Sequence, residues 1–457
     1  MYKLLKRLAG ISVFYAFANS IEALTPFFLA ILLTRFLQPG EYGIWVLFVS
    51  LVAFLRPVVN LTIQDALKMH FYEMDKDRRA TFVVSAFYIS SGSALILALA
   101  AVLFDDTLSA LVKFPAPWIV SVVVATYLYV NFYFLLAFNQ FAEKRGQFIA
   151  LQFAQSLLGL AIIAALVYQG WGWQGVILGK IAGLAMACLL GVVWLNGQLK
   201  LDLRLPCREQ LRDLVRFGLV YLPTGFGLVA VPLTDRLIIS HILGLDQNGL
   251  YGVAALFGAA LFVAINGFLH AWMPWLFQQL GKPRGALGME VPVISAGFLL
   301  LLPLAGAVFY LVSMVAAPFL IGAAFSSAFS LIPWAIAGTV AMGYFYHIQA
   351  YLHFKKAILP MSVSSLNCIL CNIVLSYYGA LSYGVAGVLA ATIAAFLISA
   401  ATSAIFIAYH YNVFGNRFAL ATHPHRHPRA CPPSVSLGDP WNDRDSNRDG
   451  LPEQVRQ

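Results

Sequence analysis

The sequence predicts an all-α polytopic membrane protein whose twelve transmembrane helices form two parallel six-helix bundles. The first observation is composition. Sixty per cent of the residues are hydrophobic and 11% are charged, whereas a soluble domain carries about 25% charged residues. A soluble chain of 457 residues could not cover its surface with so few charges. The second observation is a series of long apolar runs, and the third is one hinge pattern that occurs in both halves.

The repeated hinge joins an apolar helix, a short polar turn and a second helix. In residues 234–254 the turn is followed by the step Tyr251-Gly252. In residues 32–48 the basic residue Arg35 precedes a Pro/Gly turn, and the step Tyr42-Gly43 follows it. The repetition predicts two related halves.

The apolar runs predict the individual helices, because a membrane-spanning helix needs about twenty mostly apolar residues. Twelve runs meet this condition. They cover residues 11–34, 42–63, 81–104, 116–138, 148–168, 174–195, 217–242, 249–275, 291–315, 328–352, 358–378 and 384–409.

The basic residues predict the orientation. With the N-terminus in the cytoplasm, 24 of the 29 Lys and Arg residues fall in cytoplasmic segments, and the outside loops hold only Lys113 and the boundary residue Arg35. An excess of Lys and Arg marks cytoplasmic loops. The rule therefore predicts cytoplasmic N- and C-termini.

These spans divide the chain into four segments. Residues 1–198 form an N-terminal six-helix bundle, 199–216 a cytoplasmic amphipathic linker, 217–411 a C-terminal bundle and 412–457 a disordered cytoplasmic tail rich in Pro, His and charge. Because each half has an even number of spans, the two repeats run parallel.

Catalytic patterns are missing from the sequence. It contains no nucleotide-binding loop, no metalloprotease string and no nucleophile elbow, so we expect neither ATP hydrolysis nor another enzymatic activity. Cys368 and Cys371 form a CxxC string, but in an apolar helix they are typical packing residues. Residues 423–427, HPHRH, could bind a metal or belong to a solvated tail; we expect no resident metal or cofactor.

The candidate functional residues are therefore the polar groups inside the spans. An ionised side chain at mid-membrane costs about 2.5–3.5 kcal/mol and needs a partner, a wet cavity or the interface. In the first span, Glu22 shares an arc with Tyr15, Asn19 and Pro26 and is the only acid. Glu22 could bind a proton or cation, touch substrate hydroxyls in a lumen, or hydrogen-bond to a neighbouring helix.

In the second span, Arg56, Asn60 and Gln64 recur every four residues and predict one polar stripe. Arg56 lies more than one turn inside the span, too deep for snorkelling alone, which favours a cation facing a cavity. In the sixth span Lys180 lies between Gly179 and Gly183. This pattern fits either close helix packing or a buried cation that faces an anion.

Asp235 and Arg236 lie near the end of the seventh span. An interfacial ion pair is one interpretation, but adjacent residues on a helix do not face each other, so we expect a different partner for each. Asn266 and His270 in the eighth span are weaker cavity candidates, and so is His347 in the tenth. A lone histidine inside a membrane is commonly a structural hydrogen-bonding group.

Together these features resemble a known family. The segments LTRFLQPGEYGIW and DRLIISHILGLDQNGLYGVA, with the twelve-span layout, resemble bacterial polysaccharide-biosynthesis flippases. These are the lipid-linked oligosaccharide (O-antigen repeat-unit) transporters of the multidrug/oligosaccharidyl-lipid/polysaccharide (MATE-like) superfamily. The resemblance covers nearly all of residues 1–410.

The resemblance implies two bundles around a central cavity that opens alternately to each side of the bacterial inner membrane. The implied substrate is a polyprenyl-diphosphate-linked oligosaccharide, moved to the outer leaflet and coupled to H⁺ or Na⁺. Implied partners are the lipid bilayer, a glycan polymerase and glycosyltransferases, with no nucleic acid. Arg56, Lys180 and Arg236 are then the cations available to a diphosphate.

Two other functions stay open on the sequence. A cation-coupled exporter of the same superfamily would need a cavity richer in acids than in bases, whereas the predicted interior has three bases and two clear acids. A membrane polysaccharide polymerase or ligase would need a sizeable outside loop, and the predicted outside loops are short.

Overall fold

A computed structural model describes residues 24–61, 63–72, 74–200, 211–212, 214–216, 218–219, 230–282, 289–355 and 357–411. Every regular element in these ranges is a helix. The chain divides into two compact units, Met1–Ala404 and Ile405–Gln457, and the contacts below belong to the first. Glu22, residues 201–210 of the linker and residues 412–457 of the tail lie outside the described ranges.

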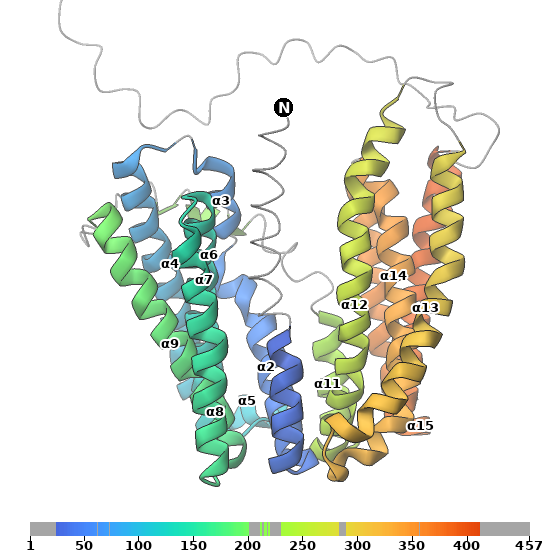
Figure 1. The fold of residues 1–457 in the computed structure, drawn as a ribbon, viewed down its shortest axis with the longest axis horizontal. Helices are drawn as coiled ribbons and strands as arrows, with labels where there is room; N and C mark the ends of the chain where they lie inside the picture. Colours follow the sequence, from blue (N-terminus) through green and yellow to red (C-terminus); the bar gives the residue numbers. More distant parts are fainter. Residues whose placement is uncertain are drawn as a thin grey trace, which may run out of the picture. The chain divides into compact units, whose positions relative to one another are not determined.

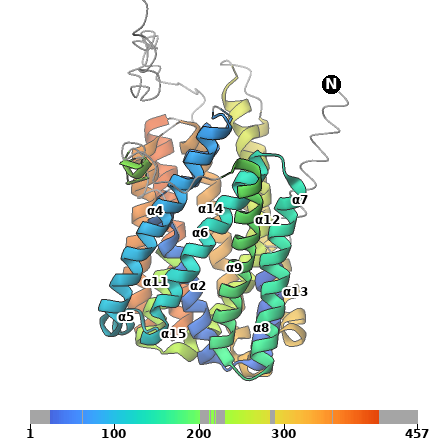
Figure 2. The same cartoon turned by 90° about the vertical axis from the view of Figure 1, so that its left-hand side faces the viewer.

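The first half begins with the apolar helix Leu24–Phe36. The labelled helices that follow are α2 (Pro39–Asn60), α3 (Ile63–His70), α4 (Lys76–Leu103), α5 (Asp105–Val112), η1 (Ala116–Trp118), α6 (Ile119–Phe141), α7 (Arg145–Phe153), the π-helical turn η2 (Ala154–Leu158), α8 (Gly159–Tyr168) and α9 (Gly172–Leu199). Helix α6 packs against α2, α4 and α9, and α8 packs along α9 (Figure 2).

The second half starts at α11 (Ala230–Ile242) and continues with α12 (Leu245–Leu280), α13 (Glu290–Leu320), η4 (Ala323–Leu331), α14 (Ile332–Phe354) and α15 (Ile358–Tyr411). Helix α14 packs against α12 and α13 (Figure 1). Each half therefore contains its own set of helices packed against one another.

The expected number of spans is confirmed. Nine described helices are long and apolar enough to cross a membrane. One of them, α15, turns at Gly384 (φ 61°), and a Cβ on Gly387 would lie 2.0 Å from the carbonyl oxygen of Gly379. Helix α15 is thus two helices folded back on each other, which makes ten. Leu24–Phe36 and α11 are the described parts of the two remaining predicted spans.

One prediction about the second span is wrong. Residues Arg56, Asn60 and Gln64 do not form one stripe, because α2 ends at Asn60 and Leu61 takes a left-handed conformation (φ 44°). Gln64 lies in α3, where its amide donates to the carbonyl of Val130 at 3.2 Å.

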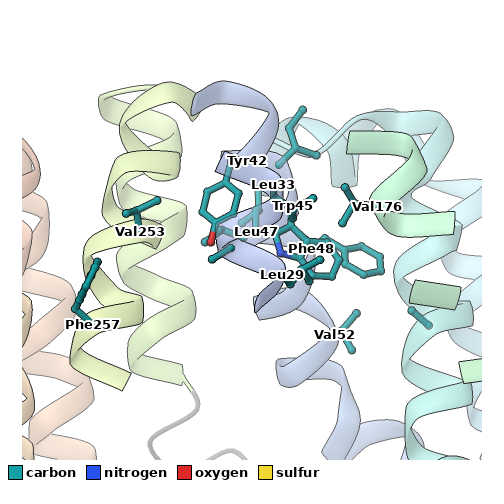
Figure 3. Packing of buried hydrophobic residues seen from close by; sticks show 14 of the residues in the cluster. Leu29, Leu33, Tyr42, Trp45, Leu47, Phe48, Val52, Val176, Val253 and Phe257 are labelled. Atoms are coloured by element: carbon teal, nitrogen blue, oxygen red, sulfur yellow. The ribbon is translucent and has the colours of Figure 1, made fainter. Parts of the chain in front are cut away.

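Helix α2 belongs to the first half and packs against helices of both halves. Tyr42 lies on the side of α2 toward Val253 and Phe257 of α12, whereas Trp45 and Phe48 lie toward α9 (Figure 3). Helix α2 packs against α4, α6 and α9 of its own half and against α11 and α12 of the second half. One apolar core therefore runs from half to half through α2.

Candidate functional site

The structure brings together two of the predicted cations, Arg56 of α2 and Lys180 of α9. The guanidinium carbon of Arg56 lies 4.9 Å from the ring centre of Tyr129, and the ammonium nitrogen of Lys180 lies 5.4 Å from the same centre. The ring centre of Tyr133, one turn further along α6, lies 5.9 Å from the guanidinium carbon of Arg56. The hydroxyl oxygens of Tyr129 and Tyr133 are 3.3 Å apart. We call Arg56, Lys180, Tyr129 and Tyr133 the cation–tyrosine cluster.

The electrostatics of this cluster favour an anion. Because both cations lie about 5 Å from one ring centre, they are at most about 10 Å apart. At that separation they repel by on the order of 2 kcal/mol at an effective dielectric constant of 20. The aromatic faces offset part of that cost through cation–π attraction. In the part of the chain that the structure describes, Arg56 forms no ion pair with a carboxylate, and its side chain is half-buried. The cluster is thus a positively charged, partly exposed polar site inside the first half.

Asp235 of α11 is the centre of a second polar site and is fully buried. Its Oδ1 accepts hydrogen bonds from the amide of Asn372 at 3.0 Å and the hydroxyl of Ser376 at 2.9 Å. Its Oδ2 accepts from the hydroxyls of Thr392 at 2.8 Å and Tyr251 at 3.1 Å. We call these five residues the Asp235 site.

The donors of the Asp235 site come from three different helical segments. Tyr251 lies on α12, Asn372 and Ser376 on the first arm of α15, and Thr392 on its second arm. The orientation of the Asn372 amide is fixed, because its oxygen accepts from Thr234 at 3.1 Å. A carboxylate surrounded by side-chain oxygens is chemically suited to a hard cation or to a proton.

Arg236, the next residue, has a different partner, as expected for neighbours on a helix. Its Nη1 donates to the hydroxyl oxygen of Ser50, on α2 in the other half. Its buried Nε has no hydrogen-bond partner among the described residues. Arg236 is therefore a cation between the two halves and forms no ion pair with Asp235 in this part of the chain.

Among the described residues, Asn60, Asn266 and His270 form no hydrogen bond with a residue of either polar site, and Glu22 lies outside the described ranges. Asn266 is half-buried and His270 exposed, and neither side chain has a hydrogen bond among the described residues. Asn60 is half-buried at the end of α2. His347, another weaker candidate, is buried, lies 3.1 Å from the Ser295 hydroxyl and stacks on Trp272 and Phe298. That arrangement is the structural role expected of a lone histidine.

The halves meet closely where α2 and α12 begin, which we call the contact end. A Cβ on Gly43 would lie 2.1 Å from the carbonyl oxygen of Leu245, and one on Gly249 would lie 2.0 Å from that of Pro39. The buried amide of Asn248 donates to the carbonyl of Gly43 at 3.0 Å. The two helices therefore touch backbone to backbone, and glycine is what permits it.

A second set of contacts closes the same end. The guanidinium of Arg35 donates to the carbonyl of Phe319 at 3.1 Å, and the amide of Gly322 donates to the hydroxyl of Thr34 at 3.2 Å. The rings of Tyr42 and Phe325 pack edge to face with centres 5.5 Å apart. The two sequence hinges thus pack against each other, and η4 covers them.

Several site residues were not identified from the sequence. Tyr129, Tyr133 and Ser50 are ordinary residues of apolar helices. Asn372, Ser376 and Thr392 do carry a signal, because they are polar residues inside the predicted last two spans, with Asn372 and Ser376 four residues apart. The sequence alone could not assign them to Asp235.

Comparison with solved structures identifies the fold. The chain is similar to the lipid II flippase MurJ in an inward closed conformation, with 14% identity, a TM-score of 0.68, and 86% of this chain and 87% of that chain covered. It is also similar to an inward-facing multidrug resistance MATE family transporter of the MOP superfamily, with 13% identity, a TM-score of 0.65, and coverage of 84% and 93%. A Vibrio cholerae MATE transporter gives 12% identity, a TM-score of 0.52, and coverage of 88% and 96%.

A search of curated protein sequences found no match. Residues 32–279, more than half of the chain, match a family described as polysaccharide biosynthesis protein. The matched region contains both hinges, the cation–tyrosine cluster and Asp235. The chain is a multi-pass membrane protein with the MOP-superfamily fold, and it belongs to the polysaccharide biosynthesis protein family.

Proposed function

We propose that this protein is a flippase that moves a polyprenyl-diphosphate-linked oligosaccharide from the cytoplasmic to the outer leaflet of the bacterial inner membrane. The observation that carries the proposal is the cation–tyrosine cluster, in which two cations face one tyrosine ring inside a bundle. A diphosphate-sugar head group is anionic and polar, so its passage needs cations and hydrogen-bonding side chains, while the lipid tail remains in the bilayer. Family membership and the flippase among the structural neighbours support this function.

The residues of the cation–tyrosine cluster have different roles toward the head group. Arg56 and Lys180 attract the diphosphate, since a partly dehydrated site screens charge less than water does. Tyr129 and Tyr133 offer ring faces and hydroxyls to the sugars. With the termini in the cytoplasm, the contact end lies outside. The contacts there then correspond to a state closed to the outside, in which the head group enters from the cytoplasm.

Transport is coupled to an ion gradient at the Asp235 site. The carboxylate of Asp235 and the hydroxyl oxygens of Ser376, Thr392 and Tyr251 would hold either Na⁺ or a proton. The fit rests on the donor set, which is one buried carboxylate among oxygen-bearing side chains. The ion supplies the free energy that biases the direction of transport. Glycosyltransferases supply the substrate, and a glycan polymerase uses the product.

An exporter of small organic cations is the second candidate function. It would need carboxylates free to meet a cation, and Asp235 already accepts four side-chain hydrogen bonds within its own half. The charge of the cation–tyrosine cluster also repels such a substrate. Both observations favour the anionic lipid-linked substrate.

The test is a flipping assay with purified protein in vesicles that contain a fluorescent polyprenyl-diphosphate oligosaccharide. We expect Arg56→Glu and Lys180→Glu each to slow flipping at least about tenfold, equivalent to ~1.4 kcal/mol, because each reverses a charge that attracts the diphosphate. Arg56→Lys should retain more activity than Arg56→Ala, since it keeps the charge and loses only the planar fork.

The matched control is Arg79→Ala. Arg79 also lies over an aromatic ring, that of Phe71 at 4.2 Å, but at the start of α4 and away from the cation–tyrosine cluster. Wild-type flipping by Arg56→Glu would exclude the cluster as the head-group site. Export of an organic cation, with no flipping of the lipid-linked substrate, would establish the second function instead.

A further inference from the structure

We propose that Arg236 is the positioning residue through which the occupant of Asp235 controls the contact between the two halves. The proposal rests on the coupling role given above to the Asp235 site. It assigns to Arg236 a function other than substrate attraction. The geometry behind it is one pair of adjacent residues with partners in opposite halves.

Asp235 ties α11 to its own half. All four of its donors come from α12 and α15, and the carboxylate is fully buried. Binding of a proton or Na⁺ requires these donors to change roles, because a neutralised carboxylate accepts fewer hydrogen bonds and Na⁺ needs lone pairs turned toward it. Occupancy of Asp235 therefore changes how α11 is held against α15.

Arg236 ties the same helix to the other half. The Ser50 hydroxyl donates to the carbonyl of Val46 at 3.0 Å, so its oxygen is oriented to accept from Arg236. Ser50 is itself buried. Because Arg236 and Asp235 share one backbone, any shift of α11 at Asp235 also moves the guanidinium, and a displacement of about 1 Å is enough to break a hydrogen bond.

Neutralising the charge of Asp235 also weakens the hold on Arg236, in addition to the shift of α11. Among the described residues, the charged or titratable groups around Asp235 are Tyr251 of α12, Cys368 of α15 and Arg236 itself. Tyr42 of α2 also acts on Arg236. Among the described residues that act on Arg236, Asp235 alone is a carboxylic acid. A proton or Na⁺ at Asp235 cancels that charge and leaves a buried cation in the seam between the halves.

The described residues of this seam do not fully satisfy the guanidinium, because the buried Nε of Arg236 has no hydrogen-bond partner among them. A buried donor left without an acceptor is destabilising, so the Ser50 contact holds only while other forces keep the guanidinium there. With Asp235 charged, Arg236 bonds Ser50 and the contact end is closed. With Asp235 occupied, Arg236 leaves Ser50 and the contact end opens.

The experiment measures the distance across the contact end by electron–electron resonance. Spin labels are attached to Gln169→Cys and Gln247→Cys, both exposed at that end, in full-length protein whose five native cysteines are replaced by serine. The protein is placed in lipid nanodiscs without lipid-linked glycan. The probes are sodium chloride against choline chloride, and acidic against neutral pH.

In otherwise wild-type protein we expect Na⁺ or acid to raise the ratio of long to short distances about tenfold, as loss of one charge-assisted hydrogen bond of ~1.4 kcal/mol would. Asp235→Asn should show the long distance under every condition. Arg236→Ala should lose the ion response, although Na⁺ or acid still raises its melting temperature through Asp235. Ser50→Ala should weaken the response, whereas Arg236→Lys should partly restore it.

An ion response of Arg236→Ala equal to that of wild type overturns the proposal. If Arg236→Ala does not fold, Ser50→Ala decides the question, because it removes the acceptor and keeps the cation. Arg79→Ala serves as the control and should respond like wild type. If wild-type protein flips lipid but its distances respond to neither Na⁺ nor acid, this inference is refuted and the proposed flippase function is unaffected. If the distances respond but no lipid is flipped, the flippase function is refuted and this inference is unaffected.

Discussion

The substitution Gly249→Ala tests how closely the two halves pack at the contact end. A Cβ at position 249 would lie 2.0 Å from the carbonyl oxygen of Pro39, whereas ordinary van der Waals contact begins at 3.4 Å. The atom it meets is backbone within the first turn of α2, so no side chain can turn aside. Helices α2 and α12 would have to separate by on the order of 1 Å.

The cost follows from the packing. Overpacking a well-packed contact costs about 1–3 kcal/mol. The clash exists only while the contact end is closed, and Ala gains up to ~1 kcal/mol over Gly in a helix in either state. The closed state is therefore disfavoured relative to the open state by about 1–3 kcal/mol, a change of about 5- to 150-fold in their ratio.

The same spin-labelled pair, Gln169→Cys and Gln247→Cys, reports this ratio. We expect Gly249→Ala to lengthen the measured distance and to slow flipping in vesicles, because a state closed to the outside is part of the transport cycle. The matched control is Gly267→Ala, on the same helix, where nothing lies within 4 Å of the added atom. If the two variants give the same distances and rates, this backbone contact does not hold the end closed.

Three further predictions concern the stability contributed by the Asp235 site, the membrane topology and the need for the C-terminal tail. Thr392→Val removes one donor to Asp235, so the free energy of unfolding should fall by about 1–3 kcal/mol and the melting temperature should drop, whereas Thr81→Val at an exposed site should change it little; equal melting temperatures would contradict the role of the Asp235 site. Reporter fusions after Lys282 should indicate cytoplasm and fusions after Gln247 the outside, and an outside signal at Lys282 would refute the predicted orientation. Truncation after Tyr411 should leave glycan display intact in a complemented strain, because residues 412–457 have too few apolar residues to form a packed core. Loss of display by a normally inserted truncate would show that the tail is needed.

The span pattern could be predicted from the sequence because it depends on local composition. A run of about twenty apolar residues is sufficient evidence for a span, whatever it packs against. The end of α2 was missed because Leu61 adopts a left-handed conformation with no glycine to announce it. The predicted stripe from Arg56 to Gln64 therefore failed.

Contacts between distant residues could not be predicted in this way. Arg56 and Lys180 were identified because charges are rare inside spans, but Tyr129 is one of 20 tyrosines and carries no signal of its own. The partners of Asp235 on α15 lie 137 to 157 residues further along the chain. Their meeting depends on the turn at Gly384 and on the packing of α11 against the second half.

That separation has a consequence for synthesis in the cell. The ribosome completes α11, with Asp235, well before Asn372 and Thr392 exist, and at about 5–20 residues per second the delay is roughly 7–30 s. During this interval a carboxylate that costs about 2.5–3.5 kcal/mol at mid-bilayer lacks its α15 donors. Until the final hairpin arrives, this cost opposes burial of the Asp235 carboxylate in the seventh span. Assembly of the second half ends, rather than begins, with the burial of Asp235.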